Sequence, residues 1–195
     1  MIVLASGSRI RRTMLENAGV AFEVQPADID EEAITQRLQE EKTTAETLAQ
    51  RLACEKALAV SKLRAEEVVI GSDQVLELDG ALLSKVSSLD EALERLCMMS
   101  GRSHRLVTAQ ALCRKGEVLR STVTPVRVTM REYDRGTAEA YLRRNMPWIL
   151  SSVACYEIEK DGIALIEAIE GSTFAALGLD LIETITMLKQ EGALT

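Results

Sequence analysis

Three arginines and two serines stand within seven residues near the start of this acidic chain. They occupy residues 6–12, between a short apolar segment and the start of an amphipathic helix. Backbone N–H groups at a helix start, a small glycine and guanidinium donors together favour the binding of a phosphate group. A solvated basic helix start would produce the same pattern, so this segment alone supports both interpretations equally.

A second set of ionisable residues lies in the middle of the chain. Asp73 follows the apolar run 67–70 and is expected just beyond a strand's carboxyl end, where α/β sheets place functional groups. There it could hold a divalent cation or orient a water, although a turn-capping aspartate is the commoner explanation. Lys56 and Lys85 could be ordinary surface lysines. If the fold brings them together with Arg11, they form a cradle for a polyphosphate.

Length and composition limit the class of protein. The 195 residues suit a single domain over 1–195. A net charge of −7 and an aromatic content of 3% argue against a nucleic-acid-binding protein. Because no signal peptide and no apolar run of the ~18 residues of a membrane helix is recognisable, we expect a cytoplasmic protein without a membrane partner. Four scattered cysteines and one histidine fit reduced thiols better than a zinc site.

Helices and strands are expected to alternate along the chain. Periodicity predicts helices at 8–18, 46–63, 89–99, 131–145 and 181–190, and strands at 2–5, 21–25, 67–70, 74–78, 81–83 and 163–169. The Val- and Thr-rich segments 104–114 and 117–129 predict a long β-hairpin, with the lone His104 as a structural residue in the turn before it. The fold class is therefore α/β, with a mixed central sheet flanked by helices.

The order of the motifs resembles the Maf family of nucleoside-triphosphate pyrophosphatases. Each motif is weak by itself, but the ordered set extends from residue 2 to beyond residue 180 and is specific. The matching segments are 4–8 with Arg11, 51–53 with Lys56, 71–75, 79–80 with 83–85, 100–104, Tyr156 with Glu159, and 169–171 with Gly178.

The resemblance implies an elongated sheet of the Maf/ITPase-like type and hydrolysis of a nucleoside triphosphate to a monophosphate and pyrophosphate. It further implies a divalent metal, Mg²⁺ or Mn²⁺, a homodimer and, for some members, a link to septum formation. Asp73 matches the catalytic aspartate that helps to bind metal and activate water, and Glu31 matches a second acidic position. The residues that match the phosphate-binding turn and the active-site lysines are Ser6, Ser8, Arg11, Lys56 and Lys85.

Gln74 and Glu159 concern the choice of base. Family members that prefer dTTP and UTP usually carry Thr and Gln at these positions, whereas this pair resembles the subgroup that prefers 7-methyl-GTP. A carboxylate accepts hydrogen bonds from the N1–H and amine of guanine, and its charge suits an N7-methylated ring. A dTTP/UTP pyrophosphatase is the alternative specificity, and a solvated acid is the alternative interpretation of Glu159.

Four single positions depart from the family pattern, and residues 151–155 replace its Asp-Lys-Ala-Gly segment. Ile10 replaces an arginine, Lys160 a glycine, and Val86 and Asp180 each a proline. These departures leave open a second hypothesis, a nucleotide-binding regulator of septum formation that no longer hydrolyses its ligand. A third hypothesis, an RNA-binding module built on the basic turn, is disfavoured by the acidic charge.

Overall fold

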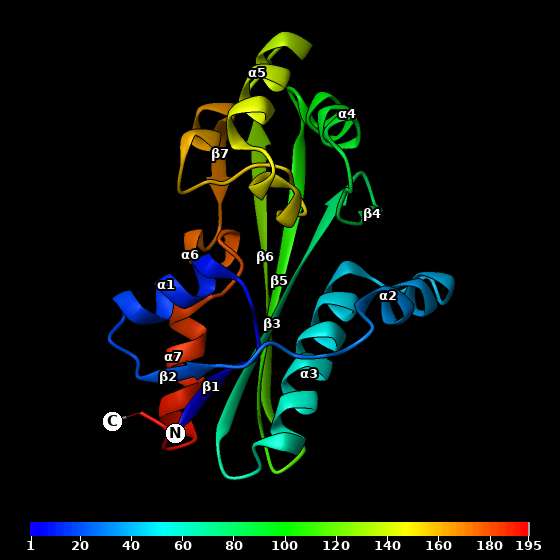
Figure 1. Cartoon of the computed structure of the whole chain (residues 1–195). Coiled ribbons are helices and arrows are strands. Elements are labelled where there is room, and N and C mark those ends of the chain that lie inside the picture. Colours follow the sequence, from blue (N-terminus) through cyan, green and yellow to red (C-terminus); the bar gives the residue numbers. More distant parts are fainter. Residues whose placement is uncertain (195) are drawn as a thin grey trace.

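Two long antiparallel strands, β5 (Ser103–Arg114) and β6 (Glu117–Met130), run through most of the length of the molecule (Figure 1). The computed structural model describes residues 1–194. Lys115 and Gly116 form the turn between the strands with φ values of 55° and 73°, a conformation that glycine adopts without strain. The predicted hairpin is therefore confirmed.

The sheet is mixed, as predicted, and contains seven strands within the described residues, in the order β2-β1-β3-β5-β6-β7 with β4 paired to β3. Its parallel part is formed by β1, β2 and the first residues of β3, and its other pairs are antiparallel. The remaining strands are β1 (Ile2–Leu4), β2 (Phe22–Val24), β3 (Val68–Leu78), β4 (Ala81–Leu83) and β7 (Ile166–Glu170).

Helices cover both faces of the sheet and its far end (Figure 1). On one face lie α3 (Ala45–Leu63) and α2 (Glu31–Glu40), and on the other lie α1 (Arg9–Asn17), α6 (Thr173–Ala176) and α7 (Leu181–Gln190). At the far end lie α4 (Leu89–Met99), α5 (Arg135–Asn145) and two 3₁₀ helices, η1 (Trp148–Ser151) and η2 (Asp161–Leu165). None of the helices in residues 1–194 combines the length and the hydropathy needed to span a membrane.

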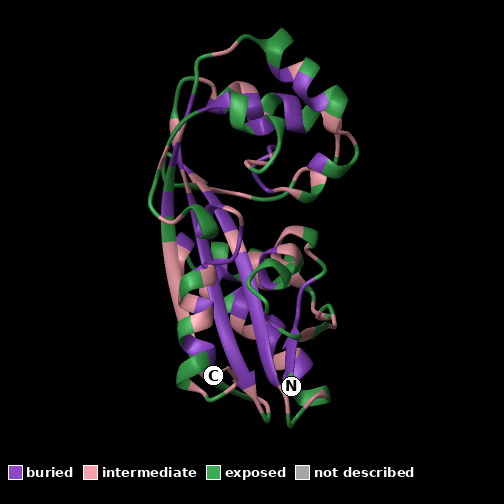
Figure 2. Cartoon of the chain, turned by 90° about the vertical axis from the view of Figure 1, so that its left-hand side faces the viewer, coloured by how far each residue is buried: buried purple, intermediate pink, exposed green. Residues whose placement is uncertain are grey.

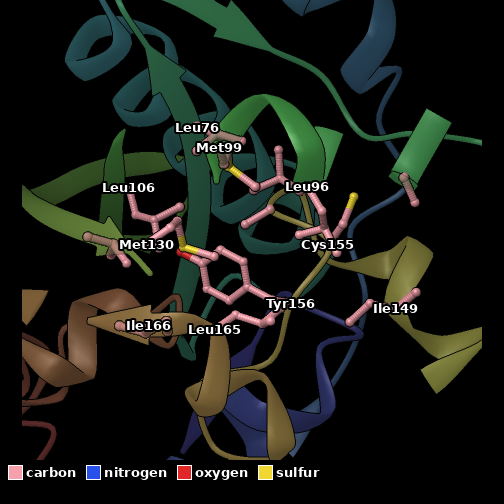
Figure 3. Packing of buried hydrophobic residues seen from close by; sticks show 14 of the residues in the cluster. Leu76, Leu96, Met99, Leu106, Met130, Ile149, Cys155, Tyr156, Leu165 and Ile166 are labelled. Atoms are coloured by element: carbon pink, nitrogen blue, oxygen red, sulfur yellow. The ribbon is translucent and has the colours of Figure 1, made fainter. Parts of the chain in front are cut away.

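Aliphatic side chains on the two faces of β3 belong to different cores. Val69 and Val75 pack beneath α3, whereas Ile70 packs with α1 and α7. Leu76 belongs to the core at the far end, where Tyr156 lies among aliphatic side chains (Figure 3). Buried residues therefore follow the strands along the whole molecule (Figure 2). This arrangement places the polar residues of β3 between separate apolar clusters.

One prediction about β3 was wrong, and the difference affects the site. The sequence suggested two strands, 67–70 and 74–78, whereas the structure has one continuous strand. Asp73 therefore lies within a strand, not beyond its end. Polar residues 72 and 73 are tolerated there because Ser72 donates to the Gly178 carbonyl and Asp73 pairs with Lys56.

Other differences concern short or capped elements. Helices α2 and α6 were not predicted, and the last strand begins at Ile166 because 161–165 is 3₁₀. Helix α5 begins at Arg135, not 131, because the Asp134 carboxylate accepts from the N–H of Thr137. His104 lies inside β5 and not in a turn, and it is only 2% exposed. The four cysteines are free thiols.

Candidate active site

The sheet leaves a gap along one edge of β3. Strand β1 pairs with residues 68–70 and β4 with residues 76–78, and both occupy the edge opposite β5. Between them, residues 71–75 have no partner on that edge among the described strands. A cavity of about 720 Å³ lies beside this gap. Its volume is within the range of ligand sites for small molecules.

This cavity brings together all the site residues that the sequence predicted. They come from the first turn, α2, α3, β3, the segment after β4 and the segment before η2. They are Ser6, Ser8, Arg11, Glu31, Lys56, Asp73, Gln74, Lys85 and Glu159. Their proximity is an observation, whereas the role of each remains a prediction.

Arg11 connects the basic turn to the gap in the sheet. Its Nη1 donates to the carbonyl of Ser72 at 2.8 Å and to Ser6 Oγ at 3.1 Å, and its Nε donates to the carbonyl of Gly178 at 2.7 Å. Burial lowers the pKa of Arg11, while the carboxylates of Asp73 and Glu31 act in the opposite direction. Only Nη2 lacks a protein partner among the described residues. Arg11 therefore organises the turn and keeps one donor group for a ligand.

The start of α1 provides further donors. Ser8 caps the helix, and Ser6 Oγ accepts from the N–H of Ser8 at 3.2 Å. The N–H groups of Arg9 and Ile10 have no hydrogen-bond partner in the part of the chain that the structure describes. Free N–H groups at a helix start attract anions. This end of the cavity is therefore suited to phosphate oxygens.

Lys56 lies between two carboxylates at the centre of the site. Its Nζ is 2.7 Å from Asp73 Oδ1 and 2.8 Å from Glu31 Oε2. Helix α3 approaches β3 closely because Gly71 has no side chain: a Cβ there would lie 2.2 Å from the carbonyl oxygen of Ala53. This close approach of α3 to β3 brings the ammonium of Lys56 within hydrogen-bonding distance of the Asp73 carboxylate.

The two carboxylates beside Lys56 fit a divalent cation that takes its remaining ligands from outside the protein. Asp73 and Glu31 offer carboxylate oxygens to one point that already attracts a cation. Residues 1–194 contain no group of three or more His, Cys, Asp or Glu residues placed to hold a metal ion. Mg²⁺ commonly binds one or two carboxylates and completes its shell with water and phosphate oxygens.

Gln74 faces the opposite side of β3 from Asp73. Its Nε2 donates to Thr108 Oγ1 at 3.0 Å and to the carbonyls of Ala175 and Ala176 at 3.0 and 3.1 Å. Carbonyls only accept hydrogen bonds, so these contacts determine which end of the amide is the nitrogen. Its Oε1 has no protein donor among the described residues, and Gln74 can therefore offer the cavity an acceptor.

Segment 147–160 forms the other side of the cavity. Glu159 is exposed and has no ion-pair partner within residues 1–194. Glu157, which sequence reasoning missed, is half-buried, pairs with Lys160 and lies 3.9 Å from Arg9 Nη2. Trp148, also missed, lines the cavity. It is the only tryptophan of the chain, and this rarity was the signal in the sequence that could have drawn attention to it.

The departures from the family pattern have structural explanations. Ile10 and Val86 pack against apolar clusters, and the ammonium of Lys160 pairs with Glu157. Asp180 caps α7 and accepts from Thr124 Oγ1 at 2.9 Å. None of the four takes part in the side-chain hydrogen bonds of Arg11 or in the Lys56–Asp73 pair.

The fold and the cavity define an α/β protein with a polar, phosphate-compatible cleft in the middle of a long mixed sheet. A family model described as "Maf-like protein" matches residues 1–191. The chain therefore belongs to the Maf family.

Named relatives match nearly the whole chain. "Nucleoside triphosphate pyrophosphatase" of Nitrobacter hamburgensis is 42% identical over 194 residues, which are 100% of this chain and 95% of the relative. The protein of the same name from Gluconobacter oxydans is 40% identical and covers 97% of this chain and 94% of its own length. "7-methyl-GTP pyrophosphatase" of Brucella suis is 40% identical, with 97% and 96% covered.

Proposed function

We propose that this protein hydrolyses a nucleoside triphosphate at the bond between the α and β phosphates, which yields a nucleoside monophosphate and pyrophosphate. The observation that carries the proposal is the convergence of Arg11, Lys56, Lys85 and two carboxylates on one cavity. The names of relatives that match 97–100% of the chain support the same reaction.

The reaction requires charge neutralisation on three phosphates and one water aligned with the bond that breaks. The start of α1 and the free Nη2 of Arg11 bind phosphate oxygens. Lys56 and Lys85 neutralise the charge that develops on the departing pyrophosphate. Asp73 accepts a hydrogen bond from the attacking water and orients it. These groups suffice without a covalent nucleophile.

A divalent cation, Mg²⁺ or Mn²⁺, belongs to this proposal. Asp73 and Glu31 would hold it together with the phosphates of the nucleotide. When bound, it supplies additional neutralisation of the phosphates and makes a bound water more acidic.

A guanine-type base, including 7-methylguanine, is the base we propose. The free carboxylate of Glu159 and the acceptor Oε1 of Gln74 are suited to the N–H donors of guanine. The O2 and O4 acceptors of uracil and thymine would meet acceptors instead, which disfavours dTTP and UTP. Two of the relatives carry the name 7-methyl-GTP pyrophosphatase.

Pyrophosphate release from a panel of triphosphates tests the reaction. The panel comprises GTP, 7-methyl-GTP, dTTP and UTP, each with Mg²⁺ and with Mn²⁺. We expect release with guanine nucleotides ahead of pyrimidine nucleotides. Binding of all four without release would instead favour the non-hydrolysing regulator of septum formation. Homodimer formation and a cytoplasmic location are further parts of the proposal, checked by light scattering and cell fractionation.

A further inference from the structure

The single tryptophan of the chain lines the cavity and is exposed to solvent. Trp148 is 72% exposed, whereas its neighbour Ile149 is completely buried. Both belong to η1, so Ile149 holds this short helix in the far-end core while Trp148 points outward. A large apolar ring that is exposed to water beside a ligand cavity is suited to packing against a bound ligand.

Of the aromatic residues that line the cavity, Trp148 is the one whose ring is exposed to a ligand. Tyr156 is the other aromatic in the lining, but it is 3% exposed and its hydroxyl is 2.7 Å from His104 Nε2. Within residues 1–194 the lining therefore offers one ring, that of Trp148, to a ligand.

Acidic groups lie on the same segment as this ring. Glu157 is neutralised by Lys160, whereas Glu159 has no ion-pair partner among the described residues. The phosphate-binding turn comes from α1, a separate part of the chain that lines the same cavity. A nucleotide whose phosphates lie at α1 would therefore extend its base toward segment 147–160.

We propose that Trp148 stacks on the base of the bound nucleotide and selects purines, above all a cationic N7-methylated guanine, while Glu159 contacts the edge of the base. Stacking against an aromatic ring favours large bases, and a ring face attracts a positive charge most strongly when it belongs to tryptophan. This inference rests on the proposed function only in requiring a nucleotide in the cavity.

Because Trp148 is the only tryptophan, its fluorescence reports the contact directly. The probes are 7-methyl-GMP, GMP, UMP and tripolyphosphate, none of which contains the α–β bond of a nucleotide substrate. We expect quenching in the order 7-methyl-GMP, GMP, UMP, and no quenching by tripolyphosphate, which has no base. Equal quenching by all four, or none by 7-methyl-GMP at concentrations that compete with substrate, would overturn the proposal.

Kinetics of two substitutions and a control give an independent test. Trp148→Ala should raise the KM for 7-methyl-GTP about 5- to 100-fold with kcat within about twofold, and Trp148→Phe should restore most of the loss. The control is Ile163→Ala, an exposed apolar residue of the neighbouring η2 that does not line the cavity. It should leave KM unchanged.

The outcomes separate this inference from the reaction itself. Base-dependent quenching without pyrophosphate release from any triphosphate would support stacking and contradict the proposed reaction. An unchanged KM in Trp148→Ala, together with a change of oligomeric state in light scattering, would overturn stacking and assign the ring to contact with a second copy of the chain.

Discussion

Lys56 Nζ and Asp73 Oδ1 lie 2.7 Å apart, and the two side chains are only 10% and 11% exposed. The pair joins α3 to the unpaired edge of β3. Removing two charges from water offsets most of their attraction, so such a pair contributes little net stability. The pair instead fixes the positions of two functional groups, because it holds a carboxylate and an ammonium side by side in a ligand cavity.

Asp73→Asn should lower turnover by about 10²- to 10⁴-fold while the protein remains folded. An amide has nearly the shape of the carboxylate and can still accept from Lys56, but it lacks the charge to hold a cation and orient water. Pyrophosphate release and circular dichroism measure the two effects. Glu77→Gln is the control, because Glu77 lies on the same strand and pairs with Arg105 outside the cavity lining. Undiminished turnover in Asp73→Asn would contradict the assigned role.

The two lysines should respond differently to substitution. Lys85 is exposed and has no carboxylate partner among the described residues, so Lys85→Ala should change stability by less than about 0.5 kcal/mol. Its kcat should nevertheless fall roughly 10²-fold. Lys56→Ala should also lower kcat, and it should reduce the free energy of unfolding by about 1–3 kcal/mol because Asp73 loses its partner. Urea denaturation and steady-state kinetics measure both. Equal losses of stability in Lys56→Ala and Lys85→Ala would contradict the expectation that only the buried lysine contributes to stability.

Divalent cations should bind well only together with a nucleotide. Asp73 and Glu31 already share the ammonium of Lys56, so the protein alone offers a cation few free ligands. We expect Mg²⁺ or Mn²⁺ to raise Tm slightly alone, and more strongly with a GTP analogue that has a methylene group between its α and β phosphorus atoms. EDTA should abolish turnover, and added metal should restore it. Full turnover in EDTA would exclude the metal from the reaction.

Most of the helices and strands, the long hairpin and the candidate residues that line the cavity were accessible from the sequence, because they depend on local periodicity and on motif order. The continuity of β3 was not. In the sequence, the polar residues 72 and 73 are typical of a turn. Only the fold shows that their partners, Gly178 and Lys56, allow them to lie within a strand. Glu157 escaped notice for the same reason, since its contacts with Lys160 and Arg9 depend on how segment 147–160 folds over the cavity.

Gly71→Ala should destabilise the protein and weaken the site together. The added Cβ would lie 2.2 Å from the Ala53 carbonyl oxygen, so α3 must move away from β3. We expect a loss of about 1–3 kcal/mol in the free energy of unfolding and a lower kcat, because Lys56 moves with α3. Gly136→Ala is the control: it lies in α5, where the nearest atom to a Cβ is 3.5 Å away. Alanine there should be neutral or slightly stabilising. Similar losses in both variants would refute the packing explanation.

His104 should make the protein less stable as the pH falls from about 6.5 to 4. Burial lowers the pKa of His104 from 6.5 to about 4, and its Nδ1 has no hydrogen-bond partner among the described residues. Below pH 6.5 the unfolded chain gains a proton at this residue that the folded protein does not accept until the pH approaches 4. The stabilisation is therefore complete above pH 6.5 and is lost below it, by roughly 3 kcal/mol in total.

Carboxylates titrate over part of the same range, so the histidine must be isolated by a variant. His104→Gln keeps a polar group near the Tyr156 hydroxyl but cannot be protonated. Urea denaturation of both proteins at intervals from pH 7.5 to 4 gives their difference in free energy of unfolding. That difference should move in favour of the glutamine variant as the pH falls below 6.5. A difference that stays constant with pH would mean that folding does not shift the titration of His104.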